Sequence, residues 1–196
     1  SERFLRDGAW ESGGFPLTRR FSGSTVGVLG LGRIGQAIAR RAAAFDTSIL
    51  YTTRRPVEGV PWEHVASVVD LARRSDVLVI AVPGGAATEN LVDAEAIDAL
   101  GPDGFLVNIA RGSVVDEDAL IAALEDGRIA GAGLDVFAHE PHVPARLIRD
   151  DVTLLPHVGS GTHETRIDMR DLTLANLRAH LDGRPLPTPV PEMSAL

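Results

Sequence analysis

Short, mostly apolar runs recur along the chain, and polar stretches with apolar residues every three or four positions separate them. Strands are predicted for the runs at residues 25–29, 48–52, 77–82, 104–108, 130–134 and 152–155. The run at 77–82 contains only apolar residues, which is typical of a strand covered on both faces. A further short extended segment is predicted near residues 62–66, directly after Pro61.

The stretches between these runs predict helices. Their expected ranges are 33–45, 67–74, 93–99, a segment that begins at Asp116 and ends before Gly127, and 162–181. Gly183 and Pro185 end the last helix, and an extended tail follows at 185–189. Because strands and helices alternate throughout, the sequence predicts an α/β fold. We expect a doubly wound parallel sheet with helices on both faces and right-handed crossovers.

The first 24 residues differ from the rest, since they are polar, rich in Gly and Arg, and show little periodicity. They predict a helix end followed by an extended arm. Trp10, Phe15 and Phe21 are isolated aromatic residues in this arm. Two interpretations stay open: the rings are buried within one subunit, or they contact another chain.

A glycine-rich turn lies between the first strand and the first helix. Gly30, Gly32 and Gly35 fit the pattern G-x-G-x-x-G of dinucleotide-binding Rossmann folds. In that fold the first glycine permits a tight turn, the second lets the backbone approach a pyrophosphate, and the third lets the helix pack on the strand. The start of the helix, at Arg33 and Ile34, then directs N–H groups at the phosphates. The alternative is a glycine-rich turn without a ligand.

Composition narrows the class of protein. With 196 residues, 44% of them hydrophobic, the chain has material for one sizeable core. A net charge of −8 argues against non-specific nucleic-acid binding. The lack of cysteine excludes disulfides and thiolate metal sites, and His157 has no metal partners at a convincing spacing, so no metal is expected. No run is long enough to span a membrane and no signal peptide is evident, so a cytoplasmic protein is expected.

The end of the second predicted strand bears on cofactor choice. An Asp or Glu there would accept a hydrogen bond from the ribose 2′-hydroxyl of NAD. This chain instead has Thr52, Thr53, Arg54 and Arg55. Because a carboxylate repels a 2′-phosphate and arginine can clamp it, the sequence favours NADP(H), with NAD(H) as a second option. The alternative is that the two arginines are only a solvated basic pair.

The end of the third apolar run also belongs to the expected cofactor site. Val82 and Pro83 end this strand where a sheet of this kind meets the far half of a dinucleotide. Thr88 lies in the following turn and has a hydroxyl that could donate to a phosphate. A helix-capping role for Thr88 is an equal alternative.

Three polar residues, Arg111, Glu140 and His157, each come just after a predicted strand. Ligands bind outside the carboxyl ends of parallel strands, so a guanidinium, a carboxylate and an imidazole are expected at one edge. Arg111 could hold a substrate carboxylate and polarise an adjacent carbonyl. His157 could transfer a proton near neutral pH, and Glu140 could orient it and stabilise its charged form. The alternative is that all three are ordinary surface residues.

With these residues placed, the chain resembles the D-2-hydroxyacid dehydrogenase family. The matching stretches are residues 28–35, 107–112, 131–137 with Glu140-Pro141, and 155–160. Their order and spacing are those of the family, and the resemblance covers nearly the whole chain. Residues 51–56 and 157–166 look most like glyoxylate/hydroxypyruvate reductases, and the hydroxyphenylpyruvate reductases look similar.

The resemblance implies roles for individual residues. Arg111, Glu140 and His157 would be the catalytic residues, and Asp135 would lie near the nicotinamide carboxamide. The matching motifs also place Ile109, Ala110, Arg111, His157, Gly159 and Ser160 at the cofactor. The nucleotide domains of the family form the dimer, so a homodimer is expected, with the arm at 10–21 as part of its interface.

Two features depart from the family pattern. Gly84 and Gly85 stand where many members have Leu-Thr, so a more mobile loop and the loss of a hydroxyl contact are expected. Members also carry a flavodoxin-like substrate domain split between the chain ends, and here it is mostly absent. Because the chain starts at Ser1 without Met, we expect a processed protein or a piece of a longer one.

The expected domain organisation follows from that comparison. Residues 1–8 would be a hinge or a remnant of the substrate domain, residues 9–171 the dinucleotide-binding domain, and residues 172–196 a helix and tail that return to the substrate domain. Such a sheet with its own core can fold alone. Without the second domain, we expect nucleotide binding with little turnover.

Three functions remain under consideration at this point. The leading one is a reductase of small 2-oxo acids that prefers NADPH. A nucleotide-sensing interaction protein on the same fold is the second, but a sensor needs no proton donor such as His157. A methyltransferase on a similar glycine-rich sheet is the third, and Arg111, Glu140 and His157 together argue against it.

Overall fold

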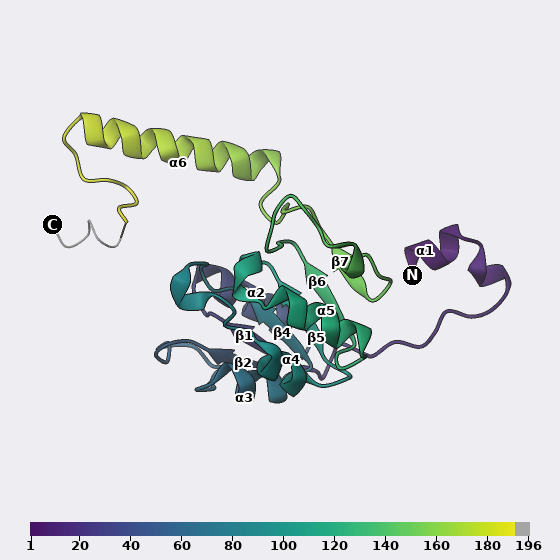
Figure 1. Cartoon of the computed structure of the whole chain (residues 1–196). Helices are drawn as coiled ribbons and strands as arrows, with labels where there is room; N and C mark the ends of the chain where they lie inside the picture. The colour runs from purple at the N-terminus through teal and green to yellow at the C-terminus, as the bar shows by residue number, and fades with distance from the viewer. Residues whose placement is uncertain (191–196) are drawn as a thin grey trace.

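The computed structural model describes residues 1–190, and a parallel sheet lies at its centre (Figure 1). The strands are β1 (Thr25–Leu29), β2 (Ser48–Thr52), β3 (Glu63–His64), β4 (Val77–Ile80), β5 (Phe105–Asn108), β6 (Gly131–Leu134) and β7 (Val152–Leu154). They lie in the order β3-β2-β1-β4-β5-β6-β7, and all neighbouring strands are parallel. The order reverses between β1 and β4, which is where a doubly wound sheet opens a ligand crevice. The predicted fold class is therefore confirmed.

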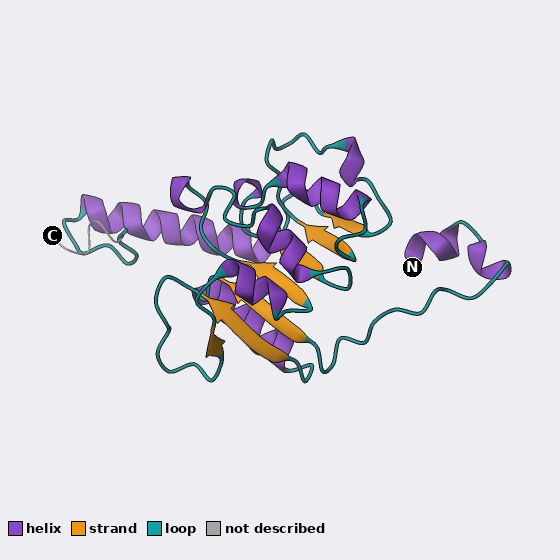
Figure 2. Ribbon diagram, turned by 60° about the horizontal axis from the view of Figure 1, so that its bottom comes forward, coloured by secondary structure: helices purple, strands orange, loops and turns teal. Residues whose placement is uncertain are grey.

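Helices connect the strands (Figure 2). They are α1 (Glu2–Arg6), α2 (Arg33–Ala43), α3 (Val68–Arg73), α4 (Ala94–Leu100), α5 (Glu117–Glu125) and α6 (His163–Leu181), with 3₁₀ turns η1 (Ala9–Glu11), η2 (Ala86–Thr88), η3 (Gly112–Val114) and η4 (Ala145–Leu147). The predicted helices are all present, and most of their ends agree to within two residues. Among the described residues, no helix is long and apolar enough to cross a membrane.

Apolar side chains pack on both faces of the sheet. On one face α3, α4 and α5 contribute residues such as Leu71, Ile97 and Leu120 to a large core cluster. On the other face α2 packs small residues, Ala39 and Ala42, against β1 and β2 in a second cluster. Burial of this apolar area is the main force that stabilises the sheet, and it places the carboxyl ends of all strands at one edge.

Two predicted strands are shorter in the structure than in the sequence pattern by two residues or more. The run at 77–82 forms a strand only to Ile80, and the next two residues leave the sheet to line a pocket. The segment at 62–66 contributes only Glu63–His64 to the sheet, as β3 beside β2. Apolar residues that line a binding site look the same in a sequence as residues inside a strand.

Both ends of the described chain extend away from the sheet (Figure 1). Residues 1–11 form α1 and η1, and an extended arm follows, as predicted. Trp10 is 66% exposed and Leu17 fully exposed, so burial of the arm within residues 1–190 is not observed. Arg19 ties the arm to the sheet by an ion pair with Asp76 at 2.7 Å.

The last helix, α6, has little cover. Ala179 is its only buried residue, and Ile167, Leu174 and Leu177 are each more than 40% exposed. The helix is continuous across residue 171, where the sequence analysis divides the chain into domains. The expected C-terminal unit at 172–196 is described only in part, because residues 191–196 lie outside the described residues.

Candidate active site

The glycine turn after β1 is so tightly packed at Gly30 and Gly35 that a side chain is excluded at both positions. Gly30 has a φ of 95°, and a Cβ there would lie 2.7 Å from the side chain of Val82. A Cβ on Gly35 would lie 1.9 Å from the carbonyl oxygen of Gly30, which brings α2 directly against the turn. A Cβ on Gly32 would meet no other atom within 4 Å, so this glycine faces open space. The three glycines thus have the tight-turn, close-approach and helix-packing positions of a dinucleotide site.

The N-terminus of α2 differs from those of the other long helices. In α3, α4, α5 and α6 the first turn donates to a capping side chain, namely Ser67, Asp93, Asp116 and Thr162. At α2 the N-cap residue is Gly32, and no side chain caps the helix. The N–H groups of its first turn are therefore directed at the space beside the glycine turn. Such a helix end, with its positive dipole, suits a phosphate.

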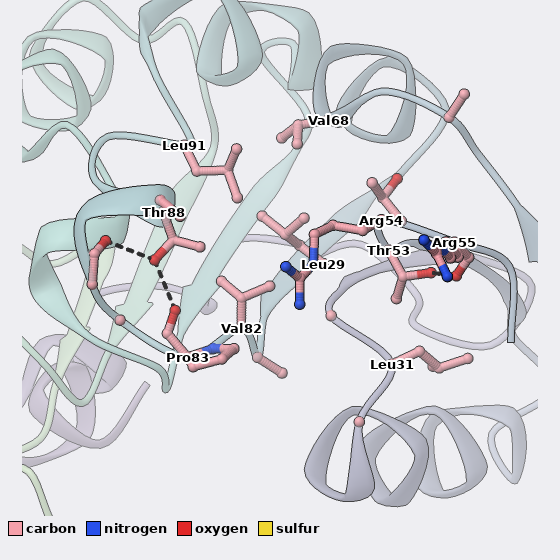
Figure 3. Close-up of a pocket in the computed structure, with 18 residues that line it drawn as sticks. Leu29, Leu31, Thr53, Arg54, Arg55, Val68, Val82, Pro83, Thr88 and Leu91 are labelled. Atoms are coloured by element: carbon pink, nitrogen blue, oxygen red, sulfur yellow. Dashed lines mark hydrogen bonds between the residues drawn. The ribbon is translucent and has the colours of Figure 1, made fainter. Parts of the chain in front are cut away.

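A pocket of about 1160 Å³ opens beside this helix end, at the carboxyl ends of β1, β2 and β4. Its lining is Leu29, Gly30, Leu31, Gly32, Thr52, Thr53, Arg54, Arg55, Ala66, Val68, Ala81, Val82, Pro83, Gly84, Gly85, Ala87, Thr88 and Leu91. Figure 3 shows Thr53, Arg54 and Arg55 on one side of the pocket and Pro83 and Thr88 on the other. The volume is slightly above the range of about 300–1,000 Å³ that is usual for small-molecule sites.

The polar residues at the end of β2 divide into two kinds. The hydroxyl of Thr52 donates to the carbonyl of Val65 at 2.8 Å, and the hydroxyl of Thr53 donates to the carbonyl of Arg55 at 2.6 Å. The hydroxyl protons of both threonines are therefore donated to backbone carbonyls of this chain. No ion pair with Arg54 or Arg55 is present in residues 1–190, so both guanidiniums remain available at the pocket.

Thr88 closes the loop on the opposite side of the pocket. Its hydroxyl donates to the carbonyl oxygens of Pro83, at 2.8 Å, and Gly85, at 3.1 Å. The hydroxyl hydrogen therefore stabilises the turn around η2. This local bonding favours the alternative structural role for Thr88, while a contact with a phosphate stays a prediction.

Arg111 follows β5 and starts η3, at the same edge of the sheet. The side chain of Asn108 fixes this corner, since it donates to the carbonyl of Arg111 and accepts from the N–H of Ala110, both at 3.0 Å. Gly112 packs against the chain after β6, where a Cβ would lie 1.9 Å from the carbonyl carbon of Phe137. The loop that carries Arg111 is thereby pressed against the loop that leads to Glu140.

Glu140 and His157 form a direct hydrogen bond, in which the imidazole Nδ1 lies 2.8 Å from the Oε2 of Glu140. The other carboxylate oxygen accepts from the N–H of Phe137 at 3.2 Å. The bond from His157 lowers the pKa of Glu140, against the opposing effect of burial, and the positive charge of Arg111 lowers it further. Glu140 is therefore a carboxylate at neutral pH, and the Nε2 of His157 has no hydrogen-bond partner among the described residues.

Asp135 binds the backbone of the two residues that follow His157. Its two carboxylate oxygens accept from the N–H groups of Val158, at 2.7 Å, and Gly159, at 2.8 Å. His157 itself has a φ of 53°, a left-handed conformation that few residues other than glycine adopt. The paired bonds to the two following residues stabilise this conformation. Contact of Asp135 with a nicotinamide carboxamide, which the resemblance implies, stays a prediction.

The three predicted catalytic residues are open to solvent in this chain. The side chain of His157 is 46% exposed and that of Glu140 is 35% exposed, and Arg111 is also exposed. Within the described residues, no group of three His, Cys, Asp or Glu side chains could hold a metal ion. The arrangement can therefore bind an anion and transfer a proton.

The structure brings some of the predicted cofactor residues together and leaves others apart. Those that line the pocket are Gly30, Gly32, Thr52, Thr53, Arg54, Arg55, Val82, Pro83 and Thr88. Arg33 and Ile34 lie at the first turn of α2, and Gly35 packs behind it. Ile109, Ala110, Arg111, Asp135, His157, Gly159 and Ser160 lie beyond the pocket, on β5, β6, β7 and their loops. Their contact with a cofactor stays a prediction.

Sequence reasoning missed several residues of this edge. Ala66, Val68 and Leu91 are apolar members of the pocket lining, and Asn108 fixes the Arg111 corner. Ala66 and Val68 could have been found from their position, because both follow the short strand β3. Asn108 was visible as a polar residue at the end of an apolar run.

Comparison with known proteins agrees with this geometry. The profile of the NAD binding domain of the D-isomer specific 2-hydroxyacid dehydrogenases matches residues 1–159. The chain is 53% identical over 190 residues to hydroxyphenylpyruvate reductase of Plectranthus scutellarioides, and 53% identical over 190 residues to glyoxylate/hydroxypyruvate reductase A of Arabidopsis thaliana. Each match covers 96% of this chain and 61% of the relative.

A solved structure shows the same fold at similar identity. It is an NADPH-dependent glyoxylate/hydroxypyruvate reductase from Sinorhizobium meliloti, in complex with NADP and malonate. The TM-score is 0.92 and the identity 49%, over 97% of this chain and 61% of the other. The chain thus spans about three-fifths of the length of these relatives. On the sequence match, the shared fold and the arrangement of the site, the chain belongs to the D-isomer specific 2-hydroxyacid dehydrogenase family.

Proposed function

We propose that the protein carrying this chain reduces small 2-oxo acids to D-2-hydroxy acids with NADPH. The observation that carries the proposal is the hydrogen-bonded pair of Glu140 and His157, at the same sheet edge as Arg111 and beside a pocket with an uncapped helix N-terminus. An anion-binding residue, a proton donor and a dinucleotide pocket together are the parts that such a reduction requires.

Each residue has a distinct task in the proposed reaction. The nicotinamide supplies a hydride to the oxo carbon. Arg111 pairs with the substrate carboxylate and polarises the neighbouring carbonyl. The Nε2 of His157 donates a proton to the carbonyl oxygen, which becomes the hydroxyl of the product. Glu140 accepts from Nδ1, and so orients the ring and stabilises the charged imidazolium that gives up this proton.

NADP(H) is the proposed cofactor, with NAD(H) as a weaker alternative. Arg54 and Arg55 lie at the pocket without carboxylate partners in the described chain, where a 2′-phosphate would attract them. A carboxylate that would repel this phosphate is absent from the end of β2, where Thr52 and Thr53 stand instead. The Sinorhizobium meliloti relative is described as NADPH-dependent and has NADP bound, which supports the assignment.

Small 2-oxo acids such as glyoxylate, hydroxypyruvate and hydroxyphenylpyruvate are the substrates named for the relatives. We extend the class to this chain because Arg111 and His157 act on the shared 2-oxo acid group, and do not depend on the side chain.

We further propose that the protein is a cytoplasmic homodimer. The support for a dimer is the arm, whose residues Trp10 and Leu17 are exposed in this chain. A second copy of the chain would remove this apolar surface from water. The cytoplasm is proposed because the reaction consumes a nicotinamide cofactor.

Oxidation of NADPH by the full-length protein tests the function. The expected result is turnover with glyoxylate or hydroxypyruvate, in the ordinary enzyme range of about 1–1000 per second, and loss of turnover in the His157→Gln variant. Tight NADPH binding without turnover of any 2-oxo acid would contradict the proposal and favour a nucleotide-sensing protein instead. Light scattering at micromolar concentration tests the dimer, and a monomer would contradict it.

A further inference from the structure

Gly84 stands in the loop after β4, and space rather than backbone conformation requires a glycine there. A Cβ on Gly84 would lie 2.7 Å from the Cγ of Arg111 and 3.1 Å from its Cβ. Carbon atoms in proteins do not approach to 2.7 Å, so one of the two residues would have to move. The neighbouring Gly85 is different, because its φ of 136° is one that glycine alone adopts readily while its Cβ position is empty.

The first carbons of the Arg111 side chain can move away from Gly84 mainly by a change of the χ1 rotamer. The atoms that approach Gly84 are the first two carbons of the side chain, so they move only if the side chain changes its χ1 rotamer or the backbone shifts. The backbone at Arg111 is fixed by the side chain of Asn108, by the close packing of Gly112 against Phe137, and by the start of η3. A side chain at position 84 would therefore redirect the guanidinium.

The same loop belongs to the nucleotide pocket. Pro83, Gly84 and Thr88 all line it, and the hydroxyl of Thr88 donates to the carbonyl of Pro83. Gly84 is thus the point at which the wall of the pocket and the stem of Arg111 touch. The guanidinium lies close to its own backbone, where Nη1 donates to the carbonyl of Ala110 at 2.6 Å.

We propose that Gly84 is a positioning residue, which sets the direction of the Arg111 guanidinium toward the carboxylate of the 2-oxo acid. The inference rests on the proposed function, in which Arg111 binds that carboxylate. The sequence alone suggested that Gly84 makes its loop more mobile. The inference gives Gly84 a second role, which is to place Arg111.

Steady-state kinetics of the full-length protein test this role through the Gly84→Ala variant. With a displaced guanidinium, KM for glyoxylate should rise at least about tenfold and kcat should fall, since carboxylate binding and carbonyl polarisation both depend on Arg111. The dissociation constant of NADPH, measured by fluorescence titration, should stay within about twofold, because a Cβ at position 84 would be directed at the Arg111 side chain. Unchanged KM and kcat would overturn the proposal.

Two other glycines provide matched controls. A Cβ on Gly133, in β6, would lie 3.8 Å from Val107, an ordinary contact, so Gly133→Ala should leave KM and kcat within about twofold. Gly32→Ala should give the opposite pattern to Gly84→Ala, with weaker NADPH binding and an unchanged KM for glyoxylate at saturating NADPH. If Gly133→Ala and Gly84→Ala raise KM equally, the effect is general and the proposal fails.

A double-mutant cycle separates the Arg111 contact from a change in the loop. Because Arg111→Ala removes the Cγ that would lie 2.7 Å away and keeps only the Cβ at 3.1 Å, adding Gly84→Ala to it should change kcat/KM by less than about twofold. The NMR signal of the Arg111 Nε–H group, assigned by its loss in Arg111→Ala, should also shift in Gly84→Ala. If the full-length protein reduces no 2-oxo acid, the proposed function fails. The NMR signal still tests the contact between Gly84 and Arg111, because an unshifted Nε–H signal would overturn the role of Gly84.

Discussion

The proposed nucleotide pocket and the proposed catalytic edge, which carries Arg111, Glu140 and His157, lie along one rim of the sheet but differ in how far the chain surrounds them. The pocket is formed by the ends of β1, β2 and β4, and a Cβ on its glycine Gly30 would lie 2.7 Å from the Val82 side chain. The catalytic edge is formed by β5, β6 and β7, and its His157 and Glu140 side chains are 46% and 35% exposed. The pocket is lined on its sides by residues of this chain, whereas the His157 and Glu140 side chains are partly open to solvent.

The difference has a chemical consequence. Binding a dinucleotide requires N–H groups, positive charge and an apolar wall, and all of these are present at the pocket. Transfer of a hydride and a proton also requires that water be kept from the reacting atoms. Hydrogen bonds hold His157 to Glu140 and the two residues after His157 to Asp135, but 46% of the His157 side chain is exposed in residues 1–190.

The largest effect is expected from comparing residues 1–196 with the full-length protein. The chain alone should bind NADPH with an affinity within about tenfold of the full-length value, because the pocket lies within it. Its turnover of glyoxylate should be lower by a factor of about a thousand or more, because the substrate is neither positioned nor shielded. Calorimetry and an NADPH oxidation assay measure the two quantities. Ordinary turnover by residues 1–196 would show that the exposed edge is complete as it stands.

Removal of the proton donor should damage the catalytic edge and spare the pocket. In the full-length protein, His157→Gln is expected to lower kcat by about 10²–10⁴-fold, the usual contribution of general acid catalysis. NADPH affinity should change by less than about threefold. A loss of NADPH binding as large as the loss of kcat would mean that the two regions are not separate.

Removal of Arg54 should weaken the pocket and spare the catalytic edge. Arg54→Ala is expected to weaken NADPH binding by about 1.5–3 kcal/mol, the scale of a hydrogen bond to a charged group, which is roughly a 10–150-fold change. NADH binding should be nearly unaffected, since NADH lacks the 2′-phosphate. Titration calorimetry with both cofactors makes the measurement. Equal affinities of the unaltered protein for NADPH and NADH would remove the basis for the assignment.

The smallest effect is expected in the pH profile of Glu140→Gln. Because the pKa of Glu140 is lowered, its carboxylate stays charged down to acidic pH and stabilises the protonated His157. Without this charge, the protonated imidazole that donates in the proposed reaction loses a stabilising partner. The basic limb of the kcat profile should therefore move to lower pH by about one unit, or about 1.4 kcal/mol. A basic limb that does not move would mean that Glu140 only orients the ring.

Most elements of the fold were predictable because they depend on local pattern. Apolar runs identified the strands from β1 to β7 except for the exact extent of β3 and β4, and helix periodicity identified α2 to α6. The glycine turn and the Arg54-Arg55 pair were also found, since their chemistry is contained in a few consecutive residues. Arg111, Glu140 and His157 were chosen as candidates because each lies in the loop after a strand, and the structure brings Glu140 and His157 into contact.

What the sequence by itself determined is therefore the order of the elements, the glycine turn and the residue types at the strand ends. The tertiary structure decided which of these residues touch. Contacts of Gly84 with Arg111, of Gly112 with Phe137, and of Asp135 with the residues after His157 join segments more than 20 residues apart in the chain. No local pattern encodes them, because they arise only when packing of the sheet and its helices brings the loops at the carboxyl edge together.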